Sequence, residues 1–182
     1  MITSHVFRTA SDLLRRHRGA SLAELCEAEN ICLLHVSMGQ GQACKGFFLF
    51  RFGVPCIVVN QDLEPWLQRV VLAHELGHAM LHRELAGQEG FRDFALFDGA
   101  DPLEKEANQF AAEILIPDKA LLSLLESGMS IYEAASELDV PYELADFKIR
   151  SMRMRGYDLA VPLYTRGNFL KGIPIREEHY GN

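Results

Sequence analysis

Residues 72–82, LAHELGHAMLH, contain the residue types of a metal-dependent hydrolase. His74 and His78 lie four residues apart, so on a helix both imidazoles project from one face and can share a metal ion. A catalytic zinc typically has three protein ligands and leaves its fourth position to water. Glu75 lies one step round the helix, from where its carboxylate could reach that water as a general base. The spacing therefore predicts a zinc hydrolase with Glu75 as its catalytic residue.

The alternative is an ordinary buried helix whose histidines cap or fill one face. Two imidazoles and a carboxylate inside an apolar helix would be costly without partners, and a metal ion would supply a partner. His82 is different, because it lies two turns from His74, about 12 Å along the helix axis. That is too far to join the same ion, so we expect His82 to face the surface or a loop.

The third ligand must come from a different segment. The pattern H-E-x-x-H-x-x-G-x-x-H is excluded, because Leu81 and Glu84 stand in place of its glycine and its last histidine. A second predicted helix, at residues 102–115, offers three carboxylates instead. They are Glu104, Glu106 and Glu113.

Helix geometry favours Glu104 among these carboxylates. At about 100° per residue, Glu104 lies about 60° from the centre of the apolar face, while Glu106 lies about 100° away on the other side and Glu113 further still. Asn108, one turn after Glu104, could hold either Glu104 or a ligand histidine in place. Glu104 also has a structural alternative, because it could complete a capping box with Asp101.

Hydrophobic periodicity and capping signals predict an α+β chain. Helices are expected at residues 5–18, 21–30, 64–82, 102–115, 118–128, 131–138 and 141–155. Strands are expected at residues 31–37, 46–52 and 55–60, with a further brief strand at 91–97 inside a loop. We also expect the strand at 55–60 to offer its edge to an extended substrate.

The sequence HELGHAMLH at residues 74–82, followed some thirty residues later by EKEANQFAAEILIP at residues 104–117, resembles the ImmA/IrrE family of zinc metallo-endopeptidases. The resemblance covers about residues 46–117. It implies that zinc is bound by His74, His78 and Glu104, with Glu75 as the catalytic glutamate. It also implies a thermolysin-like core, in which a small mixed sheet packs against the HExxH helix and a second ligand helix.

Family members typically cut helix-turn-helix repressors, so the implied partner is an XRE-type repressor. Its cleavage would release mobile-element or stress genes, which makes the protein an anti-repressor. The rival hypothesis is a non-catalytic zinc-binding regulator that binds DNA or a repressor without cutting it. An intact Glu75 favours the enzyme, because a structural zinc site is normally closed by four protein ligands.

Residues 131–155 have the length and the turn of a helix-turn-helix. Six basic and two acidic residues lie between positions 146 and 171, which would suit DNA binding. We favour instead a helical subdomain that packs on the core and turns its basic residues to solvent. An intermediate reading is that the basic residues bind an acidic surface of the protein substrate.

Length and composition set the remaining limits. A chain of 182 residues suggests one domain, divided into a catalytic core with N-terminal helices (1–117), the helical subdomain (118–156) and a tail (157–182). The formal charge of -7 argues against broad affinity for nucleic acid or anionic membranes. No apolar stretch reaches the ~18 residues of a transmembrane helix. The four cysteines form no C-x-x-C pair and follow no secretory signal, so we expect reduced thiols in a cytoplasmic protein.

Overall fold

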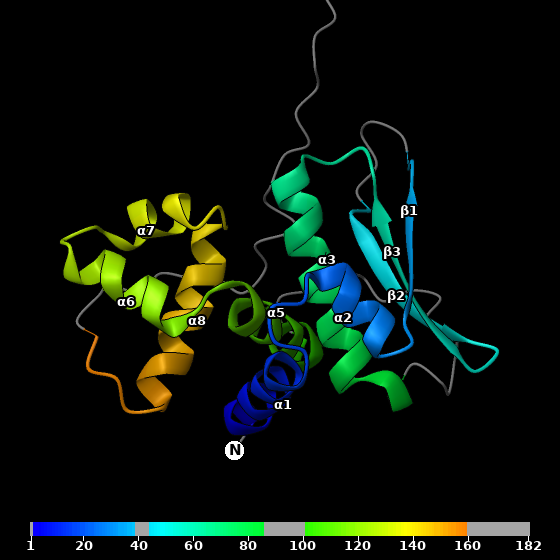
Figure 1. Ribbon diagram of the computed structural model, residues 1–182, viewed down its shortest axis with the longest axis horizontal. Coiled ribbons are helices and arrows are strands. Elements are labelled where there is room, and N and C mark those ends of the chain that lie inside the picture. The colour runs from blue at the N-terminus through cyan, green and yellow to red at the C-terminus, as the bar shows by residue number, and fades with distance from the viewer. Residues whose placement is uncertain (1, 39–43, 86–100, 160–182) are drawn as a thin grey trace, which may run out of the picture.

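The computed structural model describes residues 2–38, 44–85 and 101–159, and it confirms an α+β fold (Figure 1). The expected strand at 91–97, together with Arg166 and Lys171 of the basic segment, lies outside these residues. The elements are α1 (Ile2–Arg16), α2 (Leu22–Ala28), β1 (Cys32–Val36), β2 (Gly46–Arg51), β3 (Val54–Asn60), α3 (Pro65–Leu81), α5 (Pro102–Leu115), α6 (Asp118–Glu126), α7 (Ile131–Glu137) and α8 (Tyr142–Met154). None of the described helices has the length and apolar character needed to cross a membrane.

The three strands form a small mixed sheet in the order β1-β3-β2. β1 runs parallel to β3, and β2 runs antiparallel to it. β3 is therefore the central strand, and both of its hydrogen-bonding edges are occupied. The expectation that residues 55–60 offer an edge to a substrate is wrong, because strand order depends on pairing between distant segments. Among the described strands, the edges belong to β1 and β2.

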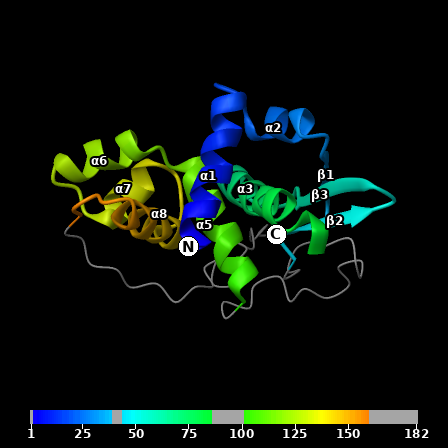
Figure 2. The same cartoon turned by 90° about the horizontal axis from the view of Figure 1, so that it is seen from below.

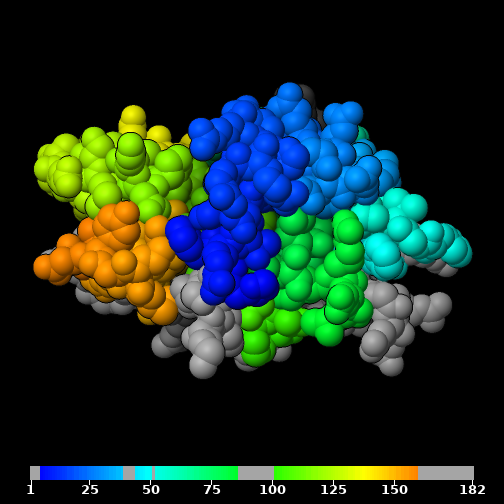
Figure 3. All heavy atoms as spheres, turned by 60° about the horizontal axis from the view of Figure 1, so that its bottom comes forward, coloured from blue at the N-terminus to red at the C-terminus, as the bar shows by residue number. Residues whose placement is uncertain are grey.

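β2 and β3 form a hairpin with a two-residue turn at Phe52 and Gly53. Both residues have positive φ, 53° and 79°, as a type I′ turn requires. The register follows from this turn, since Arg51 pairs with Val54 and Gly46 pairs with Val59. The hairpin projects from the body of the molecule and is coloured cyan in Figure 3.

α3 is the central helix of the fold, and it packs against β2 and β3 on one side and α5 on the other. α1 contacts α3, α5 and α8, and it crosses the middle of the molecule in Figure 2. α6, α7 and α8 gather on the side away from the sheet. One continuous cluster of buried apolar side chains extends from the sheet through α3 and α5 to α8. This cluster holds the central helix in place from both sides.

Candidate metal centre

α3 carries three of the predicted site residues into the interior. His74 and Glu75 are fully buried, and His78 is 5% exposed. The helix begins with Pro65 at its first turn and ends at His82, as the sequence predicted to within one residue. Because apolar residues surround all three side chains, burial of their polar atoms needs a specific partner.

α5 supplies that partner by crossing α3 at Gly77. A Cβ atom placed on Gly77 would lie 3.0 Å from the Cα of Ala107 and 3.1 Å from its carbonyl oxygen. Only glycine therefore allows the two helices to approach so closely without displacement. Asp101 caps α5 by accepting a hydrogen bond from the backbone N–H of Leu103. Glu104 is thus not needed as a capping residue, and its side chain is buried against α3.

Two histidines and one glutamate converge at this crossing. The Nε2 atoms of His74 and His78 lie 3.2 Å apart. Each of them is 3.3 Å from a carboxylate oxygen of Glu104. One ligand atom from each residue fits within a mutual distance of 4.8 Å. Two imidazole nitrogens and one carboxylate are a donor set that suits a catalytic zinc.

The other ring nitrogens of the two histidines also have partners. His74 Nδ1 lies 2.9 Å from Oδ1 of Asn108, the residue predicted to hold either Glu104 or a ligand. His78 Nδ1 lies 3.0 Å from Nδ1 of His82, and His82 Nε2 lies 3.1 Å from Glu106. The expectation that His82 faces the surface or a loop is therefore wrong, since its side chain is only 2% exposed.

The distance of His82 from His74 does not determine its contacts, because its nearer neighbour on the helix is His78. His82 follows His78 by four residues, so the two rings share one face of the α3 surface. That spacing is visible in the sequence and could have predicted their contact. The contact between His82 and Glu106 could not be predicted from the sequence, because it depends on how α5 is placed against α3.

The pKa values of the three residues depend on one another. Burial alone would raise the pKa of Glu104, but hydrogen bonds and charges from His74 and His78 hold it at about 2. Burial lowers the pKa of His78 to about 4, against the effect of Glu104. Burial also opposes protonation of His74, yet Glu104 and Glu75 shift its pKa upward overall. The centre therefore holds an ionised carboxylate between two imidazoles at neutral pH.

Glu75 lies between the cluster of His74, His78 and Glu104 and strand β2. Both of its carboxylate oxygens are buried, and the backbone N–H of Phe48 on β2 favours the charged form of the carboxylate. Burial raises the pKa of Glu75 to about 7. A Cβ atom on Gly46, the first residue of β2, would lie 3.6 Å from Cγ of Glu75 and 2.5 Å from Cγ1 of Val71. The glycine allows β2 to pass directly over α3 at the position of Glu75.

The basic residues of α8 do not form a free cationic surface. Lys148 is 2% exposed and binds Glu113 and Asp118 at 2.5 and 2.7 Å. Arg155 binds both carboxylate oxygens of Asp118, at 2.6 and 2.9 Å. The expectation that these residues are solvated is wrong for Lys148 and Arg155.

Two further basic residues of α8 also have partners. Arg150 pairs with Asp146, and Arg153 donates to the carbonyl oxygen of Leu159. The count of charges in the sequence could not reveal the partners of Lys148 and Arg155, because Glu113 and Asp118 belong to α5 and α6.

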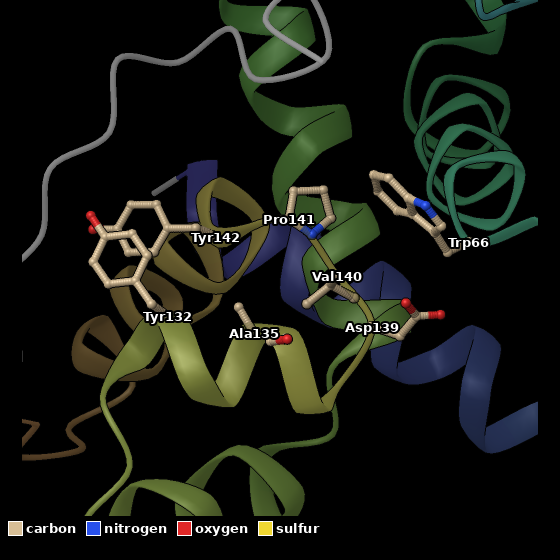
Figure 4. A pocket seen from close by; sticks show the side chains of 8 residues that line it. Trp66, Tyr132, Ala135, Asp139, Val140, Pro141 and Tyr142 are labelled. Atoms are coloured by element: carbon tan, nitrogen blue, oxygen red, sulfur yellow. The ribbon is translucent and has the colours of Figure 1, made fainter. Parts of the chain in front are cut away.

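A separate cavity of about 310 Å³ lies between the start of α3 and the turn that joins α7 to α8 (Figure 4). The rings of Tyr132 and Tyr142 stack at 4.1 Å with an interplanar angle of 10°. Trp66 and Asp139 line another part of this cavity. None of the lining residues belongs to the metal-binding cluster.

Comparisons with known proteins agree with this geometry. Residues 26–150 match the model of a peptidase family described as the IrrE N-terminal-like domain. An uncharacterized immunity region protein 2 of Bacillus phage phi105 is 30% identical over 136 residues, which cover 75% of this chain and 84% of that protein. Metallopeptidase ImmA of Bacillus subtilis strain 168 is 29% identical over 141 residues, covering 75% of this chain and 79% of the relative. The matched residues include all of α3 and α5.

Proposed function

Because the chain belongs to the ImmA/IrrE family of metallopeptidases, we propose that it is a zinc-dependent endopeptidase that cuts a helix-turn-helix repressor. His74, His78 and Glu104 are the proposed zinc ligands, and Glu75 is the proposed catalytic residue. The observation that carries the proposal is the convergence of three buried ligand atoms within 4.8 Å, next to the fully buried carboxylate of Glu75.

The contacts of the two histidines specify which ring nitrogens are available to zinc. Asn108 Oδ1 can only accept, so Nδ1 of His74 must donate and Nε2 keeps its lone pair. Glu106 accepts from Nε2 of His82, which leaves Nδ1 of His82 to accept from Nδ1 of His78. Nε2 of His78 then also keeps its lone pair. Both free lone pairs belong to the atoms that face Glu104, as metal coordination requires.

The proposed chemistry divides between the zinc and Glu75. When bound, zinc would polarise the scissile carbonyl and make the attacking water more acidic. Glu75 takes a proton from that water and later delivers it to the leaving amine. Its side chain is suited to this task because it is buried beside the proposed ligands, and burial raises its pKa to about 7, near the pH at which a general base works best.

The proposed position of the substrate is along the outer edge of β2. Among the described strands β2 pairs only with β3, and it passes over Glu75 at Gly46. An extended peptide added to this edge would run antiparallel or parallel to β2 and bring one of its carbonyl groups to the metal centre. This assignment replaces β3, which has no free edge.

The proposed repressor substrate rests on family membership and on the name of the phage relative, which places that protein in an immunity region. A repressor acts where transcription occurs, so the proposal includes a cytoplasmic location. The test is to incubate the zinc-loaded protein with the repressor encoded beside its gene and to measure intact masses. Two fragments whose masses sum to that of the repressor plus one water support the proposal. An intact repressor that is instead bound, or DNA that is retarded on a gel, would favour a non-catalytic regulator.

A further inference from the structure

Two cysteines that are distant in the sequence lie opposite each other in the sheet. Cys32 on β1 pairs with Cys56 on β3 in the parallel ladder, so both side chains project from the same face. Adjacent strands lie about 4.7–4.9 Å apart. Because the Cα atoms of a disulfide are usually about 4.4–6.8 Å apart, the backbone spacing permits a direct bond between the two sulfurs.

Both thiols are free, and one of them is accessible. Cys32 is exposed, and Cys56 is partly buried beside it. The pKa of Cys56 is raised, first by burial and then by interaction with the Cys32 thiol, its partner in the ladder. The other two cysteines have no such neighbour in the register of the sheet, and Cys26 is fully buried.

The pair lies on the face of the sheet that points away from the metal centre. Ile57, the next residue of β3, is fully buried on the opposite face, where β3 packs against α3. Along β1, Leu34 and Val36 follow Cys32 on the outer face and are exposed. A reagent can therefore reach Cys32 without entering the buried cluster of His74, His78 and Glu104.

We propose that Cys32 and Cys56 form a redox-active dithiol, which small-molecule disulfides oxidise to an intramolecular disulfide between β1 and β3. The exposed Cys32 thiolate attacks one sulfur of the reagent and expels one reduced thiol. Cys56 then loses its proton and attacks the Cys32 sulfur of this mixed disulfide, which expels the second reduced thiol. Two electrons pass from the cysteine pair to the reagent, and the two protein thiol protons end on the two expelled thiols.

The bond is expected to be reversible. Exposed disulfides exchange readily with thiols, because an attacking thiolate can reach a sulfur atom. A monothiol present in excess should therefore restore both free cysteines. This inference concerns a different surface from the proposed peptidase centre and holds whether or not that centre is catalytic.

The experiment uses the full-length, metal-loaded protein and oxidised glutathione as the probe. Intact mass under native conditions should show the loss of two hydrogen atoms, without a lasting glutathione adduct. Digestion without reductant should yield a cross-linked pair of peptides that contains Cys32 and Cys56. In Cys56→Ser the second step is blocked, so a glutathione adduct should accumulate on Cys32. Cys44→Ser is the matched control, and it should form the disulfide between Cys32 and Cys56 as the wild type does.

Two results would overturn the inference. One is a wild-type protein that keeps a glutathione adduct or stays unmodified. This result counts only when the Cys32 thiol is shown to be reduced at the start. The other is a disulfide that joins any different pair of cysteines. Circular dichroism establishes that the variants fold, and the wild-type peptide map decides the question even if a variant does not.

Discussion

His82 and His78 contact each other through their Nδ1 atoms, 3.0 Å apart, and His82 extends the contact to Glu106 at 3.1 Å. These contacts link Glu106 on α5 through His82 to His78 on α3, whose Nε2 atom faces Glu104. A histidine ligand is held in one tautomer by the partner of its other nitrogen. His82 and Glu106 therefore serve the proposed centre by orienting His78, without reaching the metal themselves.

Replacing His82 with alanine should weaken metal binding by roughly 10- to 100-fold, because His78 would lose the partner that fixes its tautomer and ring orientation. The measurement is a competition titration of zinc against a chromophoric chelator. His35→Ala is the control, since His35 is an exposed histidine on β1. Equal zinc affinity in His82→Ala and the wild type would contradict the proposed role of His82.

Replacing Glu75 with glutamine should leave zinc content unchanged and reduce cleavage by at least about 100-fold. Glutamine keeps the shape of the side chain but has no basic oxygen to take a proton. Cleavage of the repressor is followed by intact mass, with zinc per chain measured on the same sample. A variant that cleaves at the wild-type rate would remove Glu75 from the mechanism.

Replacing Gly77 with alanine should destabilise the protein by about 1–3 kcal/mol, because the added Cβ would lie 3.0 Å from the backbone of Ala107. Relief of this contact would move α5 away from α3 and Glu104 away from both histidines. Urea denaturation and zinc affinity are measured together. If the variant matches the wild type in both, the close crossing of α3 and α5 is not what positions Glu104.

The ion pairs of Asp118 should make the free energy of unfolding depend on pH in the acid range. Opposed by partial burial, the hydrogen bonds and charges of Arg155 and Lys148 lower the pKa of Asp118 from 3.8 to about 2. A lowered folded-state pKa means that the contribution is fully present above about pH 4 and is lost as the pH falls through about 2. Asp118→Asn should lower the free energy of unfolding by about 1–2 kcal/mol at pH 6 and by less at pH 3. The range allows for partial exposure of the carboxylate.

Denaturation midpoints at the two pH values test this dependence. Asp12→Asn is the control, because Asp12 forms only an exposed ion pair with Arg15. An Asp118→Asn penalty that is the same at both pH values would show that the ion pairs of Asp118 do not stabilise the fold through its charge.

Local signals in the sequence predicted the elements that carry the proposed site. α3 and α5 were placed to within one residue, because periodicity, Pro65, Asp101 and Pro102 act within a single turn of chain. The inward direction of Glu104 followed from helix geometry alone. Local signals also begin α2 and α7, where Ser21 with Glu24 and Ser130 with Glu133 form capping boxes.

Contacts between distant segments could not be predicted in the same way. The central position of β3 depends on β1 pairing with it, and the burial of Lys148 depends on Glu113 and Asp118 from two other helices. The apposition of Cys32 and Cys56 likewise exists only once β1 and β3 pair. Each of these features is set by tertiary packing, on which local residue patterns carry no direct information.

Glu104, and not Glu106, is the residue proposed to complete a metal site with His74 and His78. The most direct test is zinc per chain after dialysis against a moderate chelator, measured for the wild type, Glu104→Gln and Glu106→Gln, with circular dichroism to confirm folding. Glu104→Gln should lose most of its zinc, because a neutral amide is a poor ligand. Glu106→Gln should stay nearly loaded, because its amide oxygen can still accept from His82. A Glu104→Gln protein that remains loaded while Glu106→Gln is empty would contradict the account.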